Sequence, residues 1–530
     1  MKPSPLQSTL KVASGAALVA SEVWEHCTKS ALQKITTSVP RGPSSDPAPE
    51  SDQTPQPLSR PQFPDVFGEN DLQKLTRSSS SDPLVENRVP SSPVERILQF
   101  GGLSMSLAMG AVSEAARRIV SPLSPEAKPA QGSPFLTAAN AERLTAGLCR
   151  MRGAALKLGQ MLSIQDESLV PPDFQKILDR VRSSANMMPR GQLLSVLRED
   201  LGEDWESKLG SFDYTPVAAA SIGQVHRVTL KTGEQVAMKV QYPGVATSIK
   251  SDLLNVKRIL QYTNVFPKGL YMDQLLKVAH DELSRECDYT IEAANQKRFK
   301  ELLIQDHDFY IPKVYDELSS KRILTSEFVN GVELDHVKTM SLERRIAIAE
   351  RLLRLCLHEL FKFRFMQTDP NWANFLYNPH LDVIYLLDFG SCSQYDEGFI
   401  RHYLSMVWAC ANMDRDAVIK HSIALGFLTG QESKLMLDAH VESAFVVGEP
   451  FRTETYNFAL SSVPARLSNL AKVMVEHRLT PPPIEAYALH RKLSGFYLAC
   501  IKLGAQIACR TSLETIVQQY DIDNVKSSAF

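Results

Sequence analysis

Three polar residues in the second half of the chain have types and spacing suited to binding a metal–phosphate complex. Asp369 and Asn374 are five positions apart in DPNWAN, and Asp388 follows an apolar run fourteen positions after Asn374. In phosphoryl transfer a protein mainly places charge: a carboxylate accepts the proton of the acceptor hydroxyl, and oxygen ligands hold Mg²⁺ on the phosphates. The spacing therefore predicts Asp369 as the catalytic base, and Asn374 and Asp388 as ligands of Mg²⁺.

A lysine upstream completes this chemistry. VAMK ends at Lys239, within the stretch EQVAMKV, and a Lys-Thr-Gly turn at 231–233 separates this stretch from SIGQVHRVTL. Two strands joined by a hairpin, with the lysine on the second, match the order in which protein kinases place their phosphate-binding lysine. The small-residue loop before them is interpreted as a cover for the nucleotide phosphates, and an ordinary packing turn is the alternative. That loop is Val217, Ala218, Ala219, Ala220 and Ser221.

Two further elements are needed to position these groups. The run 272–303 is predicted to be one long helix carrying a glutamate that holds Lys239 in place. Of its acidic residues, Glu282 is expected to be solvated. The run ILTSEFVNGVEL is predicted to be a strand that leads into a hinge, whose backbone would hydrogen-bond adenine. The hinge residues are Ser326, Glu327, Phe328 and Val329.

Four motifs resemble those of the UbiB (aarF-domain) atypical kinase family, over roughly residues 138–510. They are KLGQ at 157–160, AAAS at 218–221, ECD at 286–288 and DPNWAN at 369–374. The resemblance implies an α+β, protein-kinase-like fold of two lobes, with ATP and Mg²⁺ as cofactors. The sequence resembles the mitochondrial branch of the family, which supports coenzyme Q biosynthesis. Its length resembles that of the shorter of two vertebrate paralogues.

The resemblance also implies roles for single residues. Glu292 would be the partner of Lys239. The KxGQ helix would fold across the active site, with Lys157 meeting Glu286 and Asp288. Gly159 and Gln160 complete that motif.

This sequence departs from ordinary kinases before Asp369. Gln367 and Thr368 stand where kinases have His and Arg, and where much of the family has a histidine and a glycine. The role of Asp369 is unaffected, but the support of its loop is open.

The composition changes along the chain define the expected organisation. Residues 1–39 resemble a targeting segment, with a basic tail as the alternative, and residues 40–93 hold eleven of the 31 prolines and are expected to be a disordered linker. Beyond a candidate membrane helix at 94–120, the expected units are a helical extension bearing KxGQ at 138–211, an N-lobe at 212–329, a C-lobe at 330–510 and a tail at 511–530.

The run 97–112 contains no charged residue, and Gly102, Ser106 and Gly110 recur on one helical face. Small residues at this interval let membrane helices approach closely, so we expect a single membrane-associated span and a homodimer formed through it. A buried or interfacial helix is the alternative, because a bilayer span needs about 20 residues.

Two classes of function remain. The first is an ATP- and Mg²⁺-dependent kinase or ATPase. The segment after Gly390 lacks the A-P-E motif of peptide-binding kinases, so a small or prenyl-lipid substrate is favoured over proteins. The alternative is a nucleotide-binding scaffold that organises coenzyme Q biosynthesis proteins. The expected partners are those proteins and membrane lipids or quinone precursors. The net charge of −2 gives no reason to expect nucleic acid.

Overall fold

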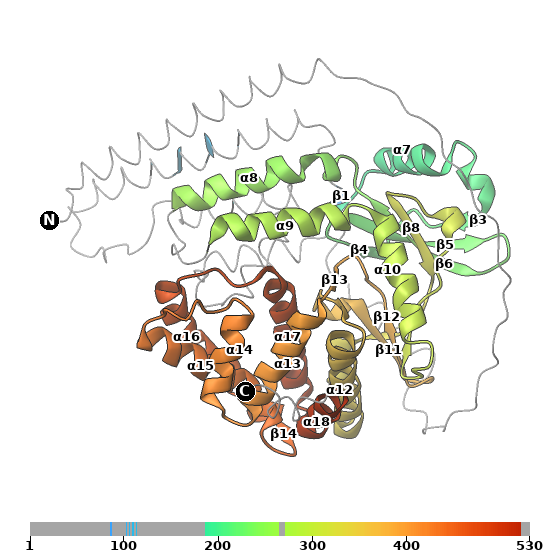
Figure 1. Ribbon diagram of the computed structural model, residues 1–530. Helices are drawn as coiled ribbons and strands as arrows, with labels where there is room; N and C mark the ends of the chain where they lie inside the picture. Colours follow the sequence, from blue (N-terminus) through green and yellow to red (C-terminus); the bar gives the residue numbers. More distant parts are fainter. Residues whose placement is uncertain are drawn as a thin grey trace, which may run out of the picture.

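The computed structural model describes residues 85–86, 102, 105–106, 109–110, 113, 142, 186–263 and 271–520. In these residues helices and sheets occur together in two lobes, as expected for an α+β kinase-like fold. Figure 1 shows the small lobe in green and yellow and the helical lobe below it in orange and red.

The N-lobe is built on a five-stranded sheet of order β3-β5-β6-β8, with β4 paired to β5. The strands are β3 (Leu209–Phe212), β4 (Ala218–Ala219), β5 (Gly223–Leu230), β6 (Gln235–Gln241) and β8 (Ile323–Glu327). The antiparallel register runs from Gly223 opposite Gln241 to Thr229 opposite Gln235, which confirms the predicted hairpin.

Helix α7 (Arg190–Leu201) belongs to this lobe rather than to a separate extension. It buries Leu193, Val196, Leu197 and Leu201, which recur at intervals of three and four on one face. This face shares a core with Val236, Met238 and Val240 of β6. The packed N-lobe therefore starts before the expected boundary at 212.

Three helices follow β6: α8 (Val245–Thr263), α9 (Met272–Glu286) and α10 (Tyr289–Leu302). Figure 1 shows α8 and α9 side by side, with α10 running beside the sheet toward the C-lobe. The predicted single helix over 272–303 is wrong in one respect, because it is divided at Cys287 and Asp288. Asp288 is extended and caps α10 by accepting a hydrogen bond from the Thr290 N–H, a role for which Asp is among the preferred residues.

Short strands of the C-lobe carry the predicted catalytic segments. They are β7 (Phe309–Tyr310), β9 (Val332–Glu333), β10 (Phe365–Gln367), β11 (Phe375–Asn378), β12 (Val383–Leu386) and β13 (Cys392–Gln394). One sheet has the order β7-β12-β11-β9, and β10 pairs with β13. The antiparallel pair β11–β12 confirms the hairpin predicted between Asn374 and Asp388.

The remaining C-lobe is helical. Its helices are α11 (Leu334–Val337), α12 (Leu342–Leu357) extended by a π-helical turn at His358–Lys362, α13 (Glu397–Ala411), α14 (Arg415–Ala424), α15 (Lys434–Gly448), α16 (Val463–His477), α17 (Ile484–Leu503) and α18 (Cys509–Gln519). Two minor strands of this lobe pair with each other, β14 (Tyr456–Asn457) and β15 (Gln506–Ile507). Earlier in the chain, β1 (Val85–Glu86) and β2 (Asn186–Met187) form a separate parallel pair.

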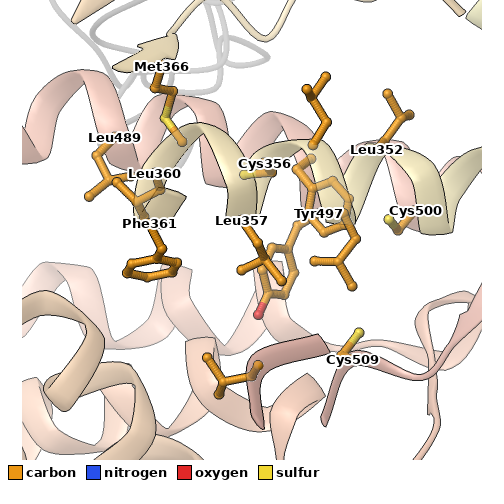
Figure 2. Packing of buried hydrophobic residues seen from close by; sticks show 14 of the residues in the cluster. Leu352, Cys356, Leu357, Leu360, Phe361, Met366, Leu489, Tyr497, Cys500 and Cys509 are labelled. Carbon is orange, nitrogen blue, oxygen red and sulfur yellow. The ribbon is translucent and has the colours of Figure 1, made fainter. Parts of the chain in front are cut away.

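Apolar side chains of α12 and α17 face one another in the C-lobe core. Figure 2 shows Leu352 and Cys356 of α12 beside Tyr497 and Cys500 of α17, with Cys509 of α18 below them. Leu513, Ile516 and Val517 of α18 join the same core. The packed C-lobe therefore extends to 519, past the expected boundary at 510.

Several predictions fall on residues that the structure does not describe. These include the targeting segment, the linker at 40–93 apart from Val85 and Glu86, and the KxGQ residues Lys157, Gly159 and Gln160. Within 94–120 the described residues are Gly102, Met105, Ser106, Met109, Gly110 and Ser113, all helical. Among the described residues, no helix combines the length and apolar character needed to cross a bilayer.

Candidate active site

The ion pair between Lys239 and Glu292 joins the N-lobe sheet to α10. Lys239 is on the central strand β6, and its Nζ donates to the two carboxylate oxygens of Glu292 at 2.8 and 3.0 Å. Glu292 is 2% exposed, so the pair is shielded from water. Burial opposes the charge on Lys239, but the carboxylates of Asp388 and Glu292 outweigh it and hold the lysine pKa well above its usual range. The structure thus brings together the two residues that the resemblance paired, with a charged lysine.

Asp388 lies at the end of β12, within reach of the same lysine. Its Oδ2 is 3.4 Å from Lys239 Nζ, and its Oδ1 accepts the Gly390 N–H at 2.9 Å. The next residue, Phe389, is buried against Phe299 of α10 with ring centroids 5.0 Å apart. Asn295 of α10 also donates to the Phe389 carbonyl at 3.0 Å. The helix that carries Glu292 therefore also fixes the DFG segment.

Asp369 and Asn374 form one small hydrogen-bonded loop. Asn374 Nδ2 donates to Asp369 Oδ2 at 2.8 Å, and the Asn374 N–H donates to the Asn371 carbonyl at 3.0 Å. The Leu387 N–H donates to the Asn374 carbonyl at 3.0 Å, which ties the loop to the residue before Asp388. The two segments predicted to hold Mg²⁺ are therefore directly bonded to each other. A carboxylate and an amide oxygen at this junction fit the few protein ligands that Mg²⁺ takes beside phosphates.

The alanine loop consists of β4, which is formed by Ala218 and Ala219, and of the tight turn that leads from it into β5. The Val217 N–H donates to the Val225 carbonyl and the Ala220 N–H to the Gly223 carbonyl, both at 2.8 Å. None of residues 217–222 has a positive φ, so the backbone of this stretch does not require glycine. The alanines at 218 and 219 are exposed. Ser221 is half-buried within the turn.

Gly223 ends this turn where the chain has no room for a side chain. A Cβ there would lie 2.5 Å from the Val240 carbonyl oxygen and 2.8 Å from Tyr289 Oη. Tyr289 is buried, its hydroxyl makes no hydrogen bond, and its ring lies 5.0 Å from Lys239 Nζ. The turn is therefore packed directly onto the residues around the lysine.

The predicted hinge follows β8. Two of its N–H groups are already donated inside the N-lobe: that of Glu327 to the Lys313 carbonyl at 2.8 Å, and that of Phe328 to the Gln235 carbonyl at 3.0 Å. Ser326 pairs with Ala237 in the sheet. Ser326 and Glu327 are still part of β8, and Phe328 and Val329 lie beyond the strand and its register.

Three acidic residues in or just after α9 lie in different environments. Asp288 lies 3.5 Å from Lys321 in addition to capping α10, while Glu286 is the last residue of α9. Their implied partner Lys157 lies outside the described residues. The expectation for Glu282 is wrong: it is buried, and its Oε2 lies 2.9 Å from Arg491 Nη2. An acidic residue on a helix is solvated only if no cation from another element reaches it. Here the cation is Arg491, which comes from α17.

Sequence reasoning also missed residues on α17 near the catalytic loop. Arg491 and Lys492 are both buried, and they contact Thr368 and Gln367. The available signal was HRKLSG at 490–495, two adjacent cations inside the otherwise apolar run of a helix.

Comparisons with known proteins agree on one family. Residues 180–422 match the family model of the ABC1 atypical kinase-like domain. The chain is 48% identical over 450 residues to the atypical kinase COQ8B, mitochondrial, of Rattus norvegicus, covering 85% of each chain. It is 40% identical over 445 residues to the atypical kinase COQ8, mitochondrial, of Saccharomyces cerevisiae, covering 83% of this chain and 88% of that one.

A solved structure supports the fold. The Mycobacterium tuberculosis protein Rv3197, determined in complex with erythromycin, superposes with a TM-score of 0.50 at 24% identity. The match covers 72% of this chain and 95% of that one.

Proposed function

Because this chain belongs to the ABC1 atypical kinase-like family, we propose that it is a mitochondrial, ATP- and Mg²⁺-dependent kinase or ATPase that supports coenzyme Q biosynthesis. The observation that carries the proposal is the arrangement of two sets of side chains. In one set Lys239 contacts Glu292 and Asp388, and in the other Asn374 donates to Asp369. These residues come from four separate parts of the chain, and together they place charge as phosphoryl transfer requires.

Each group has a role in this proposal. The charged Lys239 binds phosphate oxygens, while Glu292 sets its direction. Asn374 and Asp388 would hold Mg²⁺, which when bound would neutralise charge on the phosphates. Asp369 accepts the proton of the attacking hydroxyl or water, whose oxygen bonds to the γ-phosphorus as the bond to the ADP oxygen breaks.

The nucleotide would be held by two backbone regions. The turn at 217–221 covers the phosphates, and the chain after β8 receives adenine. Since Glu327 and Phe328 already donate their N–H groups within the N-lobe, adenine would pair with Val329 N–H and with hinge carbonyls.

A small or prenyl-lipid acceptor is proposed over a protein substrate. After Gly390 the chain returns at once to β10 through β13, and α13 begins at Glu397. This short segment offers little backbone on which a peptide could dock. The proposal includes membrane association and self-association through 97–112, with quinone precursors or membrane lipids and coenzyme Q biosynthesis proteins as partners.

Phosphate release by the purified full-length protein tests the proposal. We expect Mg²⁺-dependent release from ATP that rises when quinone-like phenols or anionic liposomes are added. Nucleotide binding without any release, in all of these conditions, would instead favour the scaffold function.

A further inference from the structure

The side of α17 that faces the active site carries two buried cations in contact with the catalytic loop. Arg491 Nε donates to the Thr368 carbonyl at 3.1 Å, and its Nη2 lies 3.4 Å from Ser391 Oγ. Lys492 Nζ donates to Gln367 Oε1 at 2.8 Å. The two residues that replace the His and Arg of ordinary kinases are thus both held from α17.

One helical turn further along, α17 contacts the loop again. An ideal Cβ on Gly495 would lie 2.0 Å from Pro370 Cβ, so the helix backbone packs directly on that proline. Glycine is required for so close an approach. Because Gln367, Thr368 and Pro370 flank Asp369 on both sides, α17 fixes the chain on each side of the candidate base.

Both cations are charge-balanced in the interior. Arg491 Nη2 lies 2.9 Å from Glu282 of α9, and Lys492 Nζ lies 3.4 Å from Glu359 of the π-helical turn. All four side chains are buried. A buried charge without a partner is strongly unfavourable, so these pairs leave the cations few alternative positions.

Arg491 also joins the loop to the segment after DFG. The Thr368 N–H donates to the Ser391 carbonyl at 2.7 Å, and the two hydroxyls of these residues are 3.0 Å apart. The guanidinium lies against both residues, so one side chain holds the base-bearing loop and the metal-binding segment together. A planar group with several donors suits such a junction better than an ammonium.

The helix that carries these groups is itself firmly packed. Leu489, Tyr497 and Cys500 of α17 lie in the C-lobe core against α12 (Figure 2). A rigid element is what precise placement of a catalytic group requires.

We propose that Arg491, Lys492 and Gly495 are positioning residues that hold Asp369 in its reactive place, and that Glu282 couples this support to α9. They act through the loop and do not touch nucleotide. The inference rests on the proposed phosphoryl-transfer function, and it supplies the loop support that Gln367 and Thr368 by themselves do not provide.

Two variants of the full-length protein test it by different physical means. Arg491→Lys reduces the number of hydrogen-bond donors but keeps the positive charge. Gly495→Ala adds a methyl group that clashes with Pro370 and changes no charge. Arg345→Lys is the matched control, because Arg345 also donates to a backbone carbonyl, that of Leu503 at 2.8 Å, at the far end of α17.

We expect kcat for ATP turnover to fall about 10- to 100-fold in both variants, since small displacements of a catalytic group have effects of this size. The affinity for ADP without Mg²⁺ should stay within about twofold, because positioning residues act on the reacting geometry rather than on uniform binding. Hydrogen–deuterium exchange of the peptide 366–374 should accelerate in both, while peptides of the N-lobe and the Arg345→Lys protein remain like wild type.

Exchange separates this inference from the function on which it rests. Wild-type exchange at 366–374 in the folded variants would overturn the positioning role, whatever the activity. An equal loss of ADP affinity and turnover would overturn it too, since that indicates general damage to the site. A wild-type protein without turnover, but with faster loop exchange in the variants, would contradict the proposed function and retain the positioning role.

Discussion

Among single residues, two of the buried glutamates around the candidate active site each lie beside a lysine. Glu292 pairs with Lys239, and Glu359 lies beside Lys492. In each case the acid comes from a helix and the cation from a different element. Buried pairs of this kind are weak sources of stability but define a single geometry when all their partners are present.

Glu359 should make stability depend on pH. Burial raises the pKa of its carboxyl to about 7, in spite of Lys492, from an ordinary value near 4.5. The folded protein therefore binds this proton more tightly than the unfolded chain. The stabilisation is fully present below about pH 4.5 and is lost as the pH rises through about 7.

Replacing Glu359 by Gln removes that titration. We expect the free energy of unfolding, measured with urea, to decline less between pH 5 and pH 8 in Glu359→Gln than in wild type, by up to about 3 kcal/mol. The exposed Glu397→Gln is the control and should follow wild type. Parallel curves for Glu359→Gln and wild type would contradict the assignment.

Among the elements, the loop at 217–221 has a backbone that alanine can adopt without strain. Glycine at position 220 would add conformations with positive φ that alanine excludes, and the turn would close more easily around a γ-phosphate. Ala220→Gly should therefore shift the ratio of ATP to ADP affinity toward ATP. Titration of both nucleotides against wild type and variant measures this ratio, and identical ratios would mean that the alanines are ordinary packing.

Elements with strong local patterns were predictable from the sequence. The hairpin β5–β6 followed from two strand-like stretches around a Lys-Thr-Gly turn, and it placed Lys239 correctly on β6. The hairpin β11–β12 followed from the distance between Asn374 and Asp388. Local order and spacing sufficed because each of these units forms within a short stretch of chain.

Features that depend on distant contacts were not predictable. Arg491 is 209 positions from Glu282, so the local sequence around either residue does not show that the two form a buried pair. The break between α9 and α10 required recognising Asp288 as a cap within a continuous helical pattern. The ends of the lobes were missed because α7 and α18 become part of each core only through tertiary packing.

For the whole molecule, we propose that the N-terminal region holds the kinase-like domain to a membrane. The uncharged run 97–112 and its small residues motivate this. We expect full-length protein in mitochondrial membranes to resist carbonate extraction and to crosslink as a dimer. The double variant Gly102→Leu/Gly110→Leu should remain in the membrane but no longer crosslink as a dimer. Complete extraction of a monomeric wild-type protein would contradict this.

Asp388→Asn is the sharpest test of whether one site, built from both lobes, turns over ATP with Mg²⁺. Asparagine keeps the size of the side chain but removes the charge that lies 3.4 Å from Lys239 and would hold the metal. We predict that Mg²⁺-dependent phosphate release falls by about 100-fold or more, while ADP binding without Mg²⁺ persists. A loss of only a few-fold in turnover would contradict the account, because the metal would then be held elsewhere.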